Sequence, residues 1–132
     1  MKIGFIGTGH MGKAIIEGFI SSKNVKSEDI FVFDIDSKKL EILADEFKVN
    51  TTTDENEAVK SSDLIILAVK PNIYDIILEK IKNSIDNNKI ILTIAAGFSI
   101  ERAEKIIGSN KKIIRTMPNT PAQVLEGMTG IV

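Results

Sequence analysis

Three glycines near the start of the chain are spaced for holding a phosphate. Gly7, Gly9 and Gly12 stand in G-x-G-x-x-G order within MKIGFIGTGHMGKAI, directly behind a short apolar run. The first turn of a helix has unpaired backbone N–H groups and the positive end of the helix dipole, which together attract an anion. Gly7 would permit a tight turn, Gly9 would let a pyrophosphate approach the backbone, and Gly12 would let the helix pack closely. The alternative is a plain tight turn, but the position of the motif favours nucleotide binding.

An acidic residue follows at the distance that a dinucleotide site requires. Asp34 ends the run FVFD, about 20 residues beyond the glycines. A carboxylate there would accept hydrogen bonds from both adenosine ribose hydroxyls and repel a 2′-phosphate, which favours NAD(H) over NADP(H). Lys38 and Lys39 lie close behind and could partly neutralise a 2′-phosphate, so NADP(H) stays open. The alternative role for Asp34 is that of a cap or turn residue beside Asp36.

Two further segments place small residues where strands are expected to end, namely AVKP (68–71) and AAG (95–97). Ligands of open parallel sheets lie across the carboxyl ends of the strands, so these segments would leave room for ribose and nicotinamide. Lys70 is either a phosphate or ribose contact or a solvated loop residue. His10, at the lip of the glycine turn, is expected to contact the cofactor or solvent rather than to act as a catalytic acid.

The segment RTMPNTPA (115–122) contains a loop stiffened by two prolines. Pro118 and Pro121 fix φ on either side of Asn119 and Thr120. An amide and a hydroxyl held at the end of a strand suit the positioning of nicotinamide or substrate. A rigid connection with local turn bonds explains the same residues equally well.

These candidates need elements that bring them to one edge, and the hydrophobic pattern predicts such elements. Short apolar strands are expected at residues 2–6, 29–34, 49–51, 63–69, 89–95 and 112–117. Helices are expected at 11–21, from Asp36 or Ser37 through Phe47, at 54–60, from Pro71 through Ile81 with Ile73, Ile76 and Ile77 on its inner side, and at 100–107. Alternating strands and helices predict an α/β fold, a doubly wound and mainly parallel sheet in a three-layer αβα arrangement.

Composition excludes several functional classes. The chain has 132 residues, the length of one domain, and a formal net charge of −1, which argues against a nucleic-acid partner. It has no cysteine and one histidine, which argues against disulfides, zinc–thiolate sites and histidine metal clusters. No apolar run is long enough for a signal peptide or a membrane span, so we expect no membrane partner and a cytoplasmic location.

The end of the sequence, GMTGIV (127–132), begins another apolar, β-prone segment and has no turn or polar tail after it. We expect the natural protein to continue beyond Val132. The alternative is a short natural protein whose last strand lies at the edge of the sheet.

Four segments together resemble pyrroline-5-carboxylate reductase: GFIGTGHMGKAI, LAVKP, AAG and R-x-MPNTPA followed by EGMT. The resemblance runs along the whole chain. It implies a Rossmann-type NAD(P)-binding domain over residues 1–132 and hydride transfer from NAD(P)H to the C=N carbon of 1-pyrroline-5-carboxylate, giving L-proline. The implied cofactor contacts are Ile6, Gly7, Thr8, Gly9, His10, Met11, Gly12, Asp34, Asn56, Ala68, Val69, Lys70, Pro71, Ala95, Ala96 and Gly97. Pro118, Asn119 and Thr120 would lie near the nicotinamide and the substrate.

The resemblance also implies what this chain lacks. Members of the family carry a second, helical domain that forms the oligomer and supplies most of the substrate-carboxylate site, so no catalytic residue is assigned here. We expect the full-length protein to be a homo-oligomer, and this chain to be a monomer or weak dimer with little or no activity. Family members often have a small polar residue in place of Asp34 and prefer NADPH, whereas Asp34 itself favours NADH. The alternatives are a β-hydroxyacid dehydrogenase-like reductase and a non-catalytic nucleotide-binding module.

Overall fold

Strands and helices alternate throughout the residues that the computed structural model describes, 1–95 and 97–116. The strands are β1 (Ile3–Ile6), β2 (Ile30–Phe33), β3 (Asn50–Thr52), β4 (Leu64–Leu67), β5 (Ile90–Thr93) and β6 (Lys112–Arg115). They form one sheet in the order β3-β2-β1-β4-β5-β6, and all neighbouring strands run parallel. This is the strand order of a Rossmann-like, doubly wound α/β fold, which confirms the predicted fold class.

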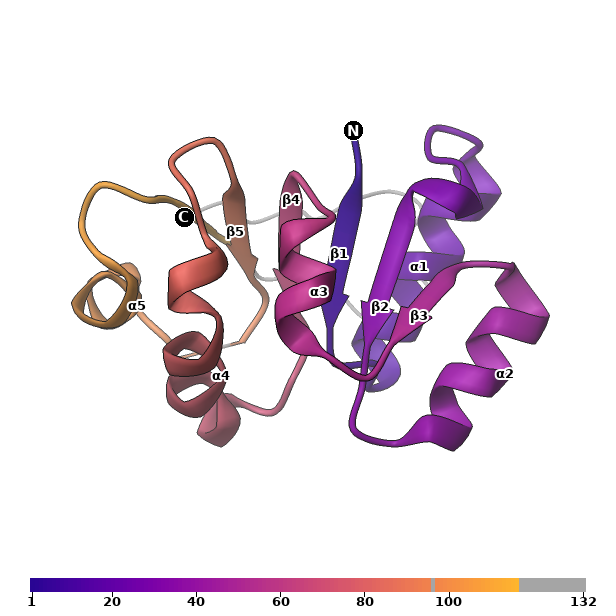
Figure 1. Ribbon diagram of the computed structural model, residues 1–132, viewed down its shortest axis with the longest axis horizontal. Helices are drawn as coiled ribbons and strands as arrows, with labels where there is room; N and C mark the ends of the chain where they lie inside the picture. Colours follow the sequence, from indigo (N-terminus) through magenta and orange to yellow (C-terminus); the bar gives the residue numbers. More distant parts are fainter. Residues whose placement is uncertain (96, 117–132) are drawn as a thin grey trace.

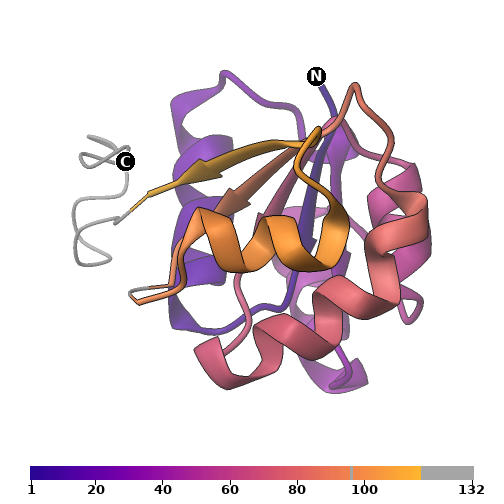
Figure 2. The ribbon, with the colours of Figure 1, turned by 90° about the vertical axis from the view of Figure 1, so that its left-hand side faces the viewer.

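Helices cover both faces of this sheet. They are α1 (His10–Ser22), α2 (Ser37–Phe47), α3 (Glu55–Lys60), α4 (Tyr74–Ile81) and α5 (Ile100–Ile107), with short 3-10 turns at Ser27–Asp29, Pro71–Ile73 and Lys82–Ser84. In Figure 1, α3 lies in front of the sheet and α1 behind it. The view turned by 90° in Figure 2 places the same two helices on opposite sides, which makes three layers.

Alternation along the strands divides the buried side chains between two cores. Ile3 and Phe5 of β1 pack with Ile15 and Ile16 of α1 and with α2, whereas Ile6 packs on the opposite face. That second core is made with α3, α4 and α5, and its largest fully buried side chain is Tyr74. Central parallel strands buried on both faces are expected to be apolar throughout, as IGFI and LIIL are.

Two local expectations need correction, and one buried residue was not anticipated. The helix expected from Pro71 begins as a 3-10 turn and becomes α-helical only at Tyr74. Ile76, expected on the inner side of that helix, is 55% exposed, because Tyr74, Ile77 and Leu78 form the buried stripe. In α1, Ile16 is fully buried although the sequence pattern did not single it out.

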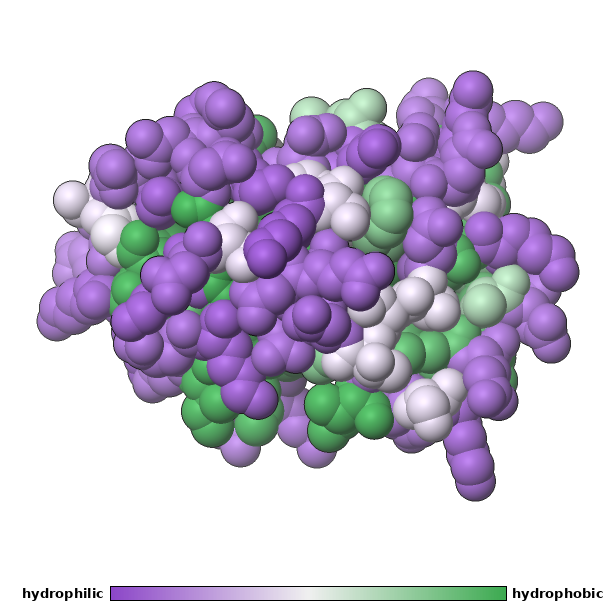
Figure 3. Space-filling model, in the orientation of Figure 1, coloured by the Kyte–Doolittle hydropathy of each residue, from purple (hydrophilic) through white to green (hydrophobic). Residues whose placement is uncertain are grey.

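The direction of the chain changes between β1 and β4, and this determines where a ligand can lie. From β1 the chain builds outward to β2 and β3, then returns to β4 on the other side of β1 and builds outward to β5 and β6. The connections after β1 and β4 therefore separate at the carboxyl ends of these strands and leave a crevice, the usual ligand position in such sheets. Apolar surface emerges along this edge, the lower edge in Figure 3, below a largely hydrophilic face.

Candidate functional site

The turn between β1 and α1 is built so closely that two of its glycines are required by packing alone. Gly7 has φ +94°, and a Cβ there would lie 2.7 Å from Cγ1 of Val69. Its N–H donates to the carbonyl of Phe33 at 2.8 Å, which joins the turn to the end of β2. A Cβ on Gly12 would lie 3.0 Å from the Cβ of Ala68. These two glycines thus serve the close approach of the turn and α1 to the segment after β4.

Gly9 differs from both of its neighbours in the motif. It has φ −62°, which any residue can adopt, and a Cβ there would meet only the carbonyl oxygen of Ala68, at 3.8 Å. Gly9 is also exposed. Neither backbone conformation nor packing within the described residues requires glycine here. Because Gly9 has no side chain, the surface beside the first amides of α1 stays accessible. That is the property a closely approaching ligand needs.

The first turn of α1 has no side chain as its cap. Gly9 is the N-cap residue, the first backbone bond runs from the Lys13 N–H to the Gly9 carbonyl at 3.0 Å, and no acidic residue lies in the first turn. The starts of α2, α3 and α5 are each capped by a side-chain oxygen, from Asp36, Asp54 and Ser99 respectively. The α1 amides therefore point out of the turn beside Gly9 with the positive end of the helix dipole, an arrangement suited to an anion such as a pyrophosphate.

Asp34 lies beside this turn and is bound to it. Its Oδ2 accepts hydrogen bonds from the Thr8 N–H at 2.9 Å and from the Thr8 hydroxyl at 2.5 Å. Its Oδ1 accepts from the N–H of Asp36 at 2.8 Å. Asp34 is only 9% exposed, yet it lines the cavity described next. It is therefore a turn residue, as one of the two interpretations of the sequence held, and also a group that a ligand in the cavity could reach.

A cavity of about 390 Å³ opens between the segments that follow β2 and β4, and we call it the β2–β4 cleft. One wall is formed by the glycine turn and the other by the loop that leads into α4. Ile35, 92% exposed, contributes an apolar side chain to its rim. A cleft with apolar walls beside a phosphate-holding turn suits a flat aromatic base and its sugar. The lining residues are Gly7, Thr8, Gly9, Phe33, Asp34, Ile35, Asp36, Lys39, Ala68, Val69, Lys70, Ile73 and Ile77.

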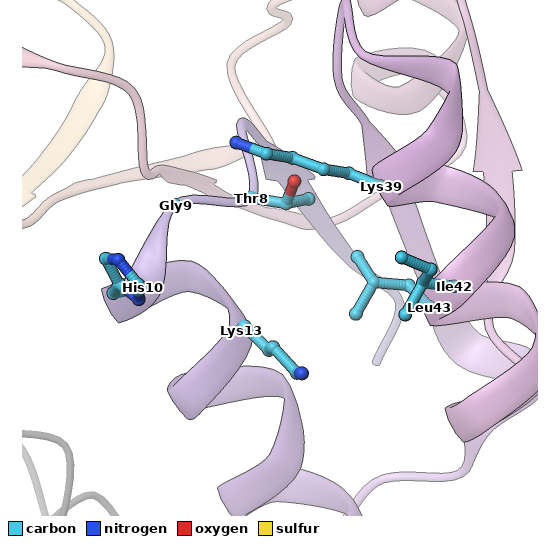
Figure 4. Close-up of a pocket in the computed structure, with 7 residues that line it drawn as sticks. All are labelled: Thr8, Gly9, His10, Lys13, Lys39, Ile42 and Leu43. Atoms are coloured by element: carbon cyan, nitrogen blue, oxygen red, sulfur yellow. The ribbon is translucent and has the colours of Figure 1, made fainter.

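A second cavity of about 320 Å³, the α1–α2 groove, lies on the other side of Thr8 and is drawn in Figure 4. Ile42 and Leu43 of α2 project toward α1, and the Lys39 side chain extends across the turn above Thr8. Lys13 points toward α2, where its ammonium lies 3.6 Å from the Glu46 carboxylate. Lys39 lines both cavities and so stands between them.

The other predicted cofactor contacts differ in whether they line these two cavities and in how far they are buried. His10 lines the α1–α2 groove but points away from Lys39, Ile42 and Leu43, and it is exposed (Figure 4). Ile6 is fully buried and belongs to the core, Met11 is half-buried against the opposite core, and Pro71 is exposed before α4. Ala95 is buried two residues after the end of β5, and Gly97 is exposed with φ +81°. Ala96, Pro118, Asn119 and Thr120 lie outside the described residues.

Asn56 is not brought to the β2–β4 cleft or the α1–α2 groove. It stands at the start of α3, where its amide oxygen accepts a hydrogen bond from the Ser84 hydroxyl at 2.6 Å. Its backbone N–H donates to the capping carboxylate of Asp54 at 2.9 Å. In the structure, Asn56 joins α3 to the turn after α4.

Sequence reasoning did not identify Tyr74, which joins two strands of this edge. Its hydroxyl donates to the carbonyl of Leu67, the last residue of β4, at 2.6 Å and accepts from the Ile94 N–H after β5 at 3.3 Å. Burial raises the pKa of Tyr74 to about 12, because the phenolate would lose its hydration. The only sequence signal is a single tyrosine within an apolar helical stripe, which is also typical of a core residue.

Neither a metal-binding cluster nor a membrane-spanning helix occurs within residues 1–95 and 97–116. In this part of the chain no group of three or more histidine, cysteine, aspartate and glutamate side chains could hold a metal ion. None of the helices there has the length and apolar character needed to cross a bilayer.

Comparison with known proteins points to one group of oxidoreductases. Residues 2–97 match the model of a family described as "NADP oxidoreductase coenzyme F420-dependent". The pyrroline-5-carboxylate reductase of Escherichia coli K12 is 41% identical over 130 residues, which are 98% of this chain and 48% of that protein. The chain thus spans about half the length of the curated relatives it matches.

Solved structures give the same result. A pyrroline-5-carboxylate reductase from Coxiella burnetii aligns with a TM-score of 0.87 and 31% identity, over 93% of this chain and 46% of that one. The Plasmodium falciparum pyrroline carboxylate reductase with NADP bound aligns with a TM-score of 0.82 and 32% identity, over 94% of this chain and 44% of that one.

Proposed function

Because this chain belongs to the family of NADP oxidoreductases described as coenzyme F420-dependent, we propose that it is the NAD(P)H-binding part of a pyrroline-5-carboxylate reductase. The reaction would reduce 1-pyrroline-5-carboxylate to L-proline. The observation that carries the proposal is Gly9, an exposed glycine that neither the backbone nor packing requires, at the start of an uncapped α1. A dinucleotide explains that glycine, the free amides and the adjoining cleft together.

Different residues of the chain would bind different parts of the cofactor. The α1 amides and Gly9 would bind the pyrophosphate, since aligned N–H groups bind an anion without a charged side chain. Asp34 would accept a hydrogen bond from the adenosine ribose, and Ile35 and Val69 would contact the base within the β2–β4 cleft. When bound, the reduced nicotinamide supplies a hydride, and orientation of the two reactants accounts for much of such catalysis.

On the choice of cofactor, we propose that NADH is preferred. Asp34 places a carboxylate in the wall of the cleft, where it would repel a 2′-phosphate. Lys39 lines the same cleft and would offset part of that repulsion, so NADPH should bind more weakly rather than not at all. The relative from Plasmodium falciparum was solved with NADP, so the preference must be measured for this chain.

Calorimetric titration of the 132-residue chain with NADH and with NADPH tests these assignments. We expect both to bind, NADH more tightly, and Asp34→Ser to shift the ratio of affinities toward NADPH by about ten-fold, the effect of one charged hydrogen bond. Asp45→Ser removes one negative charge from an exposed position of α2 that lines neither the cleft nor the α1–α2 groove, and it is the matched control. A wild-type chain that binds neither nucleotide would refute the function, and an unchanged ratio in Asp34→Ser would refute the role of Asp34 alone.

The division of the active site is a separate proposal. We infer that a second, helical domain beyond these residues forms the oligomer and completes the substrate site. The 132-residue chain should therefore bind nucleotide without reducing pyrroline-5-carboxylate at an appreciable rate. Robust turnover by the purified chain would overturn this division. Turnover of a hydroxy acid but not the imine by the full-length protein would instead favour a β-hydroxyacid dehydrogenase-like reductase. The cytoplasmic location stays a prediction.

A further inference from the structure

The hydroxyl of Thr8 makes a contact that the nucleotide-binding turn itself does not need. The backbone N–H of residue 8 donates to Oδ2 of Asp34 at 2.9 Å, and any residue other than proline would supply it. The hydroxyl adds a second donor to the same oxygen at 2.5 Å. Thr8 is 7% exposed and Asp34 is 9% exposed, so water competes little with this pair. The Thr8 side chain therefore adds a buried hydrogen bond to the carboxylate beyond the one that the backbone makes.

Counting acceptor positions shows what this contact does to Asp34. A carboxylate has about four lone-pair positions, two on each oxygen. Both positions of Oδ2 are used by Thr8, whereas Oδ1 accepts only the Asp36 N–H among the described residues. One acceptor position remains, on Oδ1. Asp34 can therefore offer a ligand in the β2–β4 cleft one hydrogen bond in a fixed direction rather than two.

We propose that Thr8 is a positioning residue that determines the preference between NADH and NADPH by holding the Asp34 carboxylate in one orientation. The proposal rests on the proposed function, in which Asp34 meets the adenosine ribose. With the carboxylate held at three points, Oδ1 is ready to accept from a ribose hydroxyl without losing side-chain freedom on binding. The negative charge is held in the same place, where a 2′-phosphate would meet it.

Removal of the Thr8 hydroxyl should change the affinities for NADH and NADPH by different amounts. In Thr8→Val, which keeps the shape of the side chain, Oδ2 loses its shortest hydrogen bond. The carboxylate is then held only by the backbone N–H groups of residues 8 and 36, and it gains freedom to turn about its χ angles. The ribose hydroxyl of NADH then meets a less ordered acceptor, so NADH binds more weakly. A carboxylate that can turn away repels a 2′-phosphate less, and Lys39 remains in place, so NADPH binding should be unchanged or stronger.

The test is calorimetric titration of wild type, Thr8→Val and Thr8→Ser with NADH and NADPH. We expect Thr8→Val to lower the ratio of NADH to NADPH affinity by about ten-fold, the effect of one hydrogen bond to a charged group. Thr8→Ser keeps the hydroxyl and should keep the ratio within about two-fold. Circular dichroism checks that the variants are folded, and Thr8→Ala replaces Thr8→Val if the valine variant is not.

A double-mutant cycle separates action through Asp34 from a general loosening of the turn. If Thr8 acts through the carboxylate, Thr8→Val should leave the ratio unchanged in a chain that already carries Asp34→Ser. An equal shift in that background would overturn the proposal, as would an unchanged ratio in Thr8→Val or a shift of the same size in Thr8→Ser. A wild-type chain that binds neither nucleotide would overturn the proposed function and this inference with it. Binding of both nucleotides with no effect of Thr8→Val would overturn this inference alone.

Discussion

The two halves of the carboxyl edge of the sheet differ in whether side chains bond the backbone groups that follow the strands. On the β1 side, the turn into α1 ends in glycine, and the first amides of α1 have no side-chain cap. On the β4–β5 side, the Tyr74 hydroxyl joins the Leu67 carbonyl to the Ile94 N–H, and Ser99 caps α5 by accepting from the Arg102 N–H at 3.1 Å. Among the described residues, these backbone groups after β4 and β5 are bonded within the protein, whereas the first amides of α1 have no side-chain partner. The start of α4 also has no side-chain cap, but the chain enters that helix through the 3-10 turn Pro71–Ile73.

This difference shows why a β–α turn alone does not indicate a site. The starts of α1 and α5 both follow a strand of one parallel sheet, and both have a helix dipole. At α5 the capping hydroxyl occupies an amide that a ligand would need. At α1 no side chain among the described residues bonds the first amides, and the neighbouring Gly9 has no side chain that would cover them. Free donors and free space together, rather than the helix end, distinguish the candidate site.

The largest loss of stability is expected from a substitution that disrupts the close packing of the glycine turn. Gly7→Ala would combine φ +94° with a contact of 2.7 Å to Val69, so the free energy of unfolding should fall by about 3 to 5 kcal/mol. Urea denaturation measures this loss. Gly97→Ala is the matched control: Gly97 also has positive φ, +81°, but none of the described residues places an atom within 4 Å of the added Cβ, so this variant should lose only about 1 to 2 kcal/mol. Equal losses would show that backbone strain, not the contact with Val69, dominates.

The next largest effect concerns the Tyr74 hydroxyl on the β4–β5 side, and the pH dependence of stability measures it. The pKa of Tyr74 is about 12 in the folded chain, against 10.0 for the free side chain. Its contribution is complete below pH 10 and is lost as the pH rises from 10 to about 12, because only the unfolded chain ionises readily there. The wild type should lose about 2 to 3 kcal/mol more than Tyr74→Phe over this range.

Ultraviolet titration supplies an independent measure of the same group. Tyr74 is the single tyrosine of the chain, and there is no tryptophan, so tyrosinate absorbance reports this residue alone. Titration near pH 10 in the folded chain would contradict the buried, bonded hydroxyl.

A smaller effect sharpens the contrast at Gly9. Gly9→Ala adds a Cβ that, among the described residues, meets only the Ala68 carbonyl, at 3.8 Å, so stability should change by no more than about 1 kcal/mol. The methyl group would stand where a pyrophosphate should approach, and NADH affinity should fall by about 30-fold, or about 2 kcal/mol. Calorimetry and urea denaturation on the same variant measure both quantities. Undiminished NADH binding would mean that Gly9 does not face the cofactor.

The smallest effect concerns the capped helix. Ser99→Ala removes the hydroxyl that caps α5 and should lower the free energy of unfolding by about 1 kcal/mol. Ser99→Asp retains a capping oxygen and should restore most of that loss. Neither variant should alter NADH affinity, since Ser99 lines neither the cleft nor the groove beside the glycine turn. A change in affinity would show that the two halves of the edge are coupled.

Much of this arrangement could be predicted from the sequence, because periodicity and motif spacing are local properties. The apolar runs at 2–6 and 63–69 mark central strands, and they contain β1 and β4. The spacing of Gly7, Gly9 and Gly12 behind the first run predicted the turn into a helix. The expected acidic residue, Asp34, does lie beside that turn. The predicted Asn119 and Thr120 lie outside the described residues and stay predictions.

Tertiary structure alone decided which of these residues face a ligand and which face the protein. The sequence treats the three glycines alike, but only the approach of Ala68 and Val69 shows that Gly7 and Gly12 serve packing and that Gly9 does not. Asp34 was expected to accept hydrogen bonds from both hydroxyls of the adenosine ribose. The structure gives Oδ2 to Thr8, a contact across 26 positions of sequence that no local pattern contains. The physical reason is that strand pairing brings distant segments together, and the pairing of β1 with β2 and β4 is a property of the whole sheet.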